Sequence, residues 1–171
     1  MYRLGDAVGR CLNRAGLDLS RCRFGVVSCG NFDVSGPGVY IFYEGEQIYY
    51  VGEANDVKRR LKEHCAAHIG GSEGVVRFFI YLFDNDLCDR LPQNWRNMKA
   101  KEREDYIKER ILKPFIGQLD IYVAICDELK DLEPRKVNSK RKEIEECLID
   151  ELKPTLNPLE PRRRGRSRAR R

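Results

Sequence analysis

The 171-residue sequence lacks several features that would place it in a specialised class of protein. No apolar run approaches the ~18 residues that a membrane-spanning helix needs, so no interaction with a membrane is expected. The first residues are interrupted by Arg3, Asp6 and Arg10, which excludes the apolar centre of a secretory signal peptide. There is no internal repeat, and no zinc finger, helix-turn-helix or other familiar DNA-reading module.

The seven cysteines show no regular spacing and include no C-x-x-C pair. Without a secretory signal, the number and spacing of these cysteines predict reduced thiols in an intracellular protein of the cytoplasm or nucleus. A zinc site built from scattered cysteines with His64 and His68 is an alternative, although the usual ligand spacing is missing.

Acidic residues are absent from the end of the chain, where residues 162–171 contain seven Arg. The whole chain has 32 Lys and Arg against 27 Asp and Glu, so the remainder has 25 basic and 27 acidic side chains. A uniformly basic protein that coats nucleic acid is therefore excluded. Residues 161–171 are predicted to be a disordered tail whose Arg162, Arg163 and Arg164 contact nucleic acid; a targeting signal or a solubilising end is equally compatible.

Hydrophobic periodicity predicts a chain of mixed helices and strands. The expected helices share an apolar stripe and cover residues 4–15, 54–65, 99–112 (ending at Pro114) and 138–152. The expected strands are rich in β-branched and aromatic residues and cover residues 39–43, 48–51 and 119–125. The first two strands form a hairpin around a turn at residues 44–47. Residues 75–83 fit a buried helix or a buried strand, and helix is preferred.

Five short motifs occur in order along these elements. They are Gly38-Val39-Tyr40, Tyr50-Val51-Gly52, Arg60 with His64 one turn later, Glu145 in E-x-x-L-I, and Asn157 in K-P-x-x-N. With these motifs and their spacing, the chain resembles the GIY-YIG nuclease family from about residue 36 to residue 157.

The resemblance implies an α+β fold in which a three-stranded antiparallel sheet is flanked by helices. The stretch between His64 and Glu145 is longer than the smallest relatives need, so a helical insertion at about residues 70–116 is expected before the third strand. The nuclease domain would then cover residues 31–160, after an N-terminal helical extension over residues 1–30.

The resemblance also implies metal-dependent hydrolysis of phosphodiester bonds in nucleic acid. DNA is the expected partner, and repair of damaged DNA and cutting of branched DNA are both open. Tyr40 would be the general base, and Tyr50 would orient the attacking water. Since a free phenol titrates near ~10, Tyr40 needs nearby cations or the metal to favour its phenolate. Arg60 would stabilise the phosphate, and one Mg²⁺ or Mn²⁺ would bind in each site.

Helical geometry distinguishes the basic residues of the segment 54–65. At ~100° per residue, Arg60 and His64 lie together on one edge of the buried stripe, while Arg59 faces solvent. By itself His64 would be a histidine on the helix surface, but the resemblance implies that it hydrogen-bonds or transfers a proton beside the water. Lys58, on the solvated basic side, is a candidate contact for nucleic acid.

Three acids compete for the metal on the last predicted helix. Glu145 lies within its apolar arc, whereas Glu143 and Glu146 lie outside it. A carboxylate on a core-facing stripe is costly unless a cation satisfies it, and the family pattern also selects Glu145 as the metal ligand. The alternative is a buried Glu145 paired with Arg60. An Asn before Pro is often only a turn residue, but the resemblance implies that the amide of Asn157 holds this loop beside the hairpin.

Glu53 departs from the pattern, because many relatives have Lys or a neutral polar residue directly after the second motif. An acid there either weakens attraction for the phosphate or supplies a second metal contact. It is the only support for an alternative function, a catalytically inactive module that binds nucleic acid. The sequence separates neither DNA from RNA nor repair from restriction or a mobile-element role, and an oligomer is compatible with it.

Overall fold

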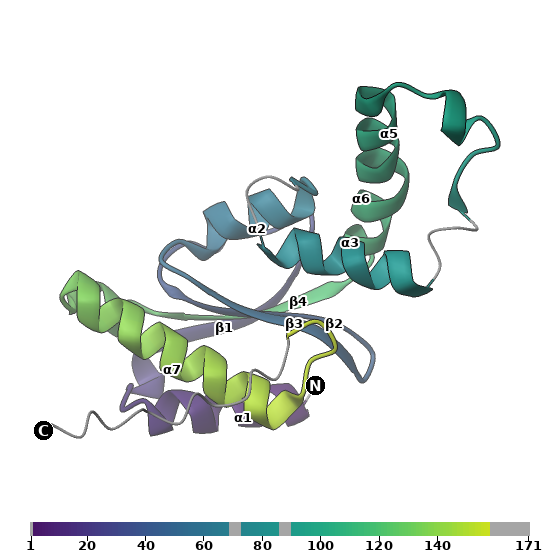
Figure 1. Cartoon of the computed structure of the whole chain (residues 1–171). Helices are drawn as coiled ribbons and strands as arrows, with labels where there is room; N and C mark the ends of the chain where they lie inside the picture. The colour runs from purple at the N-terminus through teal and green to yellow at the C-terminus, as the bar shows by residue number, and fades with distance from the viewer. Residues whose placement is uncertain (1, 69–72, 86–89, 158–171) are drawn as a thin grey trace, which may run out of the picture.

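A computed structural model describes residues 2–68, 73–85 and 90–157, and its centre is a four-stranded antiparallel sheet of order β1-β4-β2-β3 (Figure 1). The strands cover β1 (Cys22–Ser28), β2 (Gly38–Glu44), β3 (Gln47–Ala54) and β4 (Asp120–Cys126). The predicted hairpin is β2–β3, and Gly45 adopts the positive φ that its tight turn requires. The expected antiparallel sheet with flanking helices is therefore confirmed.

The additional strand is β1, which lies inside the segment expected to be a helical extension. Residues 1–30 contain a helix, α1 (Tyr2–Arg14), but Cys22–Ser28 pairs along β4, with Phe24 opposite Ala124. β1 occupies a sheet edge and exposes Phe24 and Val26, so burial along it does not alternate cleanly. The local sequence pattern of β1 is therefore weak. Its partner β4 lies about 100 residues later, so only the tertiary pairing identifies β1 as a strand.

Helices cover both faces of the sheet. In Figure 1, α1 and α7 (Pro134–Leu152) lie on one side, and α2 (Val57–Cys65) and α3 (Glu73–Asn85) lie on the other. Because strand side chains alternate, Tyr40 and Phe42 of β2 join the core beneath α2 and α3. Val39 and Ile41 join the core against α1 and α7. The two-sided burial explains the continuous apolar character of β2.

The segment between α2 and β4 consists mainly of helices where it is described. It contains α3, the 3₁₀ turn η2 (Trp95–Asn97), α5 (Ala100–Tyr106), the π-helical η3 (Ile107–Leu112) and α6 (Lys113–Gly117). The expectation that the helix ends at Pro114 is wrong, because Pro114 lies in the first turn of α6. The backbone N–H groups of a first turn have no partner within the helix, so a proline is tolerated there.

Six of the cysteines form three disulfides, which corrects the expectation of reduced thiols. The pairs are Cys11–Cys147, Cys22–Cys126 and Cys29–Cys65. The first two join residues 136 and 104 positions apart, so spacing along the chain could not reveal them. The seventh, Cys88, lies outside the described residues.

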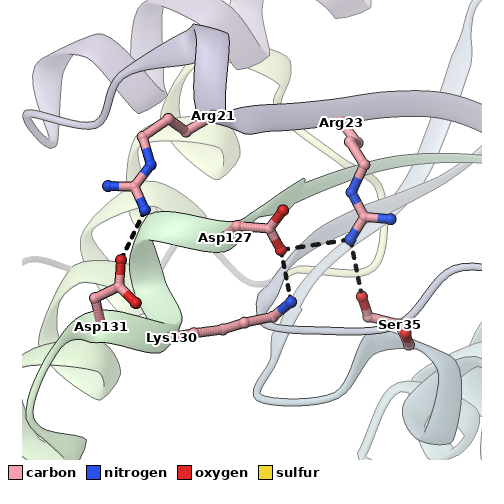
Figure 2. A network of polar contacts seen from close by, with 6 residues as sticks. All are labelled: Arg21, Arg23, Ser35, Asp127, Lys130 and Asp131. Carbon is pink, nitrogen blue, oxygen red and sulfur yellow. Dashed lines mark hydrogen bonds and ion pairs between the residues drawn. The ribbon is translucent and has the colours of Figure 1, made fainter.

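A polar network holds the loop before β2 against the end of the sheet (Figure 2). Arg23 lies 3.5 Å from the Asp127 carboxylate and donates to the carbonyl of Ser35. Lys130 reaches the same Asp127 oxygen at 2.6 Å. These side chains are exposed, so water and salt screen the ion pairs and each contributes little to stability. Their effect is to position the segment that leads into Gly38.

None of the helices in the described ranges combines the length and apolar character that a membrane-spanning helix needs.

The Cys29–Cys65 disulfide gives a stability prediction, because it ties the end of α2 to the segment after β1. Replacing both cysteines by serine should lower the free energy of unfolding by about 2–4 kcal/mol, measured by urea denaturation without reductant. Peptide mapping of the non-reduced parent should recover the linked Cys29 and Cys65 peptides. Equal unfolding energies together with an unlinked map would contradict this pairing.

Candidate active site

The hairpin positions two tyrosines because its motif glycines allow close approach. Tyr40 of β2 lies opposite Gly52 of β3, and a Cβ at Gly52 would come within 2.5 Å of the Tyr40 hydroxyl. A Cβ at Gly38 would collide with the backbone carbonyl of Ala124 in β4. Gly38 and Gly52 are therefore needed for packing, and Gly52 leaves the space that the Tyr40 ring fills.

α2 carries His64 into direct contact with Tyr40. Asp56 is the N-cap residue of α2, and its side chain accepts a hydrogen bond from the backbone N–H of Arg59. His64 is fully buried, and its Nε2 lies 3.0 Å from the Tyr40 hydroxyl. The Tyr50 ring packs 5.7 Å from the imidazole. The structure thus brings Tyr40, Tyr50 and His64 into one buried cluster.

Burial controls protonation in this cluster. Burial, assisted by the positive charge of Arg60, lowers the pKa of His64 to about 3, so the imidazole is neutral at neutral pH. Burial raises the pKa of Tyr50 to about 12. It also raises the pKa of Tyr40 well above 10, although Arg60 acts in the opposite direction. The Arg60 charge favours the Tyr40 phenolate as expected, but burial outweighs it.

The basic residues of α2 separate as helical geometry predicts. The Arg60 side chain is partly buried and forms an ion pair with Glu63 at 2.9 Å, while Arg59 is largely exposed. The Lys58 ammonium lies 2.8 Å from the Asp33 carboxylate. Lys58, a candidate DNA contact, therefore forms an ion pair within the protein. The other candidates, Arg162, Arg163 and Arg164, lie outside the described residues.

Glu145 of α7 has the electrostatics of a candidate metal ligand. It is partly buried, whereas Glu143 and Glu146 are exposed. Burial, followed by the negative charge of Glu53, raises the pKa of Glu145 to about 7. Across the described ranges, no hydrogen bond or ion pair to its carboxylate is formed, so the alternative pairing with Arg60 is not observed. A partly buried carboxylate under the negative charge of Glu53 fits a divalent cation, which would favour its ionised form.

Asn157 holds the chain after α7 against the free edge of β3. Its Oδ1 accepts a hydrogen bond from the Val51 N–H, and its Nδ2 donates to the Val51 carbonyl, both at 2.8 Å. Just before it, the Leu156 N–H donates to the carbonyl of Tyr49. This contact is the one expected for the loop, and it covers an edge that would otherwise be unpaired.

Sequence reasoning missed three residues at the site. Arg77 of α3 donates to the Leu156 carbonyl at 2.9 Å, and its charge lowers the pKa of both Glu145 and Tyr50. Gly74 lets α3 approach, since a Cβ there would collide with the His64 ring. Arg141 is buried and forms an ion pair with Glu53. Only Arg141 had a sequence signal, because it precedes Glu145 by four residues and so shares its helix face.

The zinc alternative is not supported in the part of the chain that the structure describes. The cluster of potential ligand atoms found there consists of Cys11, Cys147 and Glu151, within 4.8 Å of one another. Cys11 and Cys147 form a disulfide, and neither His64 nor His68 belongs to this cluster.

Comparisons with known proteins agree with this geometry. Residues 36–113 match the model of the GIY-YIG catalytic domain. A 53-residue stretch is 40% identical to the UvrABC system protein C of Fervidobacterium nodosum; it covers 29% of this chain and 9% of that protein. No solved structure matches the chain. The chain is thus similar to a small part of a much longer protein.

The contact between Gly52 and Tyr40 gives one testable prediction. Gly52→Ala should force the Tyr40 ring to move and lower the free energy of unfolding by about 1–3 kcal/mol, measured by urea denaturation. The matched control is Gly117→Ala, because a Cβ at Gly117 meets nothing within 4 Å. If both variants are as stable as the parent, the close approach at Gly52 is wrong.

The buried state of His64 gives a second prediction. The pKa of His64 lies near 3 in the folded protein and near 6.5 in the unfolded chain, so only the unfolded chain takes up this proton as the pH falls through that window. His64 therefore costs stability progressively below about pH 6.5. We expect its ring NMR signals to stay unchanged from pH 7 to about pH 4.5, with exposed His68 assigned in parallel. Protonation of folded His64 near pH 6 would contradict its burial.

Proposed function

Because residues 36–113 match the GIY-YIG catalytic domain, we propose that the chain is a metal-dependent endonuclease that hydrolyses phosphodiester bonds in DNA. The observation that supports this proposal best is the convergence of four elements. β2 supplies Tyr40, β3 supplies Tyr50, α2 supplies Arg60 and His64, and α7 supplies Glu145.

Tyr40 and His64 are proposed to act together in proton transfer. The neutral imidazole can accept the Tyr40 hydroxyl proton at Nε2, in the tautomer that leaves this nitrogen unprotonated. Tyr40 can then take a proton from the attacking water while its own proton passes to His64. The phenol stays neutral throughout, which agrees with its raised pKa. A phosphate beside Arg60 would counter the positive charge that opposes protonation of His64.

The remaining site residues are proposed to bind and orient. Arg60 would neutralise charge that develops on the phosphate, as guanidinium groups do in phosphoryl transfer. Tyr50 packs on His64 and would hydrogen-bond the attacking water. Asn157 ties the chain after α7 to Val51, and so holds Glu145 beside the hairpin.

Glu145 is proposed to bind one Mg²⁺ or Mn²⁺, with water and phosphate oxygens as the other ligands. Such a cation lowers the pKa of bound water and withdraws charge from the phosphate oxygens. Glu53, which favoured a module that only binds nucleic acid, forms an ion pair with Arg141. Its charge is balanced within the protein, so it no longer supports that alternative.

Cleavage assays with matched variants test the proposal. With Mg²⁺ or Mn²⁺ and plasmid, branched or single-stranded DNA, we expect Tyr40→Phe, Arg60→Ala and Glu145→Ala each to reduce the cleavage rate about 100-fold or more. The controls are Arg59→Ala and Glu143→Ala, which remove an exposed neighbour of the same type. The controls should cleave at the rate of the parent.

Folding must be compared in the same experiment, by circular dichroism and thermal unfolding. The proposed function is wrong if folded Tyr40→Phe, Arg60→Ala and Glu145→Ala cut as fast as the parent. It is also wrong if the parent binds DNA tightly but cuts none of these substrates with either metal.

A further inference from the structure

Arg141 is an unusual residue for the interior of α7. It is 4% exposed, and the buried polar residues of the described chain are Arg141, His64 and Asn157. The other two belong to the candidate active site. A buried guanidinium is strongly destabilising unless a carboxylate neutralises it, so the position of Arg141 depends on its partner.

The partner is Glu53, the acid that directly follows the second motif. The ion pair joins α7 to β3, next to the Gly52 that accommodates Tyr40. Arg141 also donates to the side chain of Asn138. Within the described chain, Glu53 Oε2 and Arg141 Nε are buried without hydrogen bonds, so charge is the main attraction between the two side chains.

The pair lies close to the proposed cation site. Arg141 precedes Glu145 by one helical turn, so the two side chains share a face of α7. Glu53 contacts Arg141 from β3, so its carboxylate also lies at this face of α7. A second carboxylate at the same face of α7 would compete to bind a divalent cation if it were released from its ion pair.

We propose that Arg141 is a positioning residue that neutralises Glu53 and withholds its carboxylate from the cation, leaving Glu145 as the protein ligand. This inference rests on the proposed function, because it takes Glu145 as the cation site. It replaces both readings that the sequence left open for Glu53. Glu53 neither repels the phosphate nor contacts the metal, because Arg141 neutralises its charge.

Direct Mn²⁺ binding tests the inference independently of cleavage, by titration followed through the EPR signal of the free ion. Arg141→Gln should tighten Mn²⁺ binding about three- to tenfold, because it releases Glu53 and removes a positive charge. Glu53→Gln should weaken binding by a similar factor, because it leaves a buried cation nearby. The double variant should bind within about twofold of the parent, since the local net charge is then unchanged.

Further variants separate electrostatics from folding. Arg141→Lys keeps the charge and should bind Mn²⁺ like the parent, so it remains informative if Arg141→Gln does not fold. A second ion pair of α7, Arg10–Glu151, is the matched control, and Arg10→Gln should leave binding unchanged. If the Glu53–Arg141 ion pair only stabilised the fold, Arg141→Gln and Glu53→Gln would change the Mn²⁺ affinity in the same direction. That result would overturn the inference.

The outcomes distinguish this inference from the proposed function. If Glu145→Gln leaves Mn²⁺ affinity unchanged, the cation site is wrong and both proposals fail. If Glu145→Gln abolishes binding but the double variant stays as weak as Glu53→Gln, Glu53 is itself a metal ligand and only the role of Arg141 is wrong. Arg141→Lys with the affinity of Arg141→Gln would also overturn it.

Discussion

The hydrogen bond between Tyr40 and His64 is the contact on which the arrangement of the site depends. It is buried between β2 and α2, and it can form only where two neighbouring positions have no side chain. Gly52 leaves room for the Tyr40 ring, and Gly74 lets α3 close over His64. Burial then keeps the imidazole neutral and the phenol protonated. The packing that makes the core compact therefore also sets the protonation state of the proposed proton-transfer pair.

Several charged residues around this buried pair form ion pairs, and Glu63 contacts both Arg59 and Arg60. Glu53 pairs with Arg141. Glu145 differs, since burial and neighbouring acids raise its pKa while only Arg77 among its principal influences lowers it. A partly buried carboxylate that few cations neutralise can bind a divalent cation. The near-neutral composition of residues 1–161 agrees with positive charge concentrated at particular positions.

Local patterns predicted much of this chain. The hairpin, the buried stripe of α2 and the inward face of α7 follow from periods of two and 3.6 residues, which neighbouring residues define. The same geometry separated Arg60 from Arg59 and Glu145 from Glu143 and Glu146. These predictions were correct because each compares residues within one element, where backbone geometry alone decides which side chains share a face.

Contacts between distant segments were beyond the reach of such patterns. β1 pairs with β4 across most of the chain, and the disulfides join residues up to 136 positions apart. The pairing of Glu53 with Arg141 depends on how α7 crosses β3, and no periodicity encodes that crossing. Protonation is the clearest case, since burial by surrounding elements moves the pKa of Tyr40 against the pull of Arg60. The amino-acid order specified which chemical groups are present and which face of each element they occupy. Folding determined their neighbours and their exposure to water, because both depend on segments that are remote along the chain.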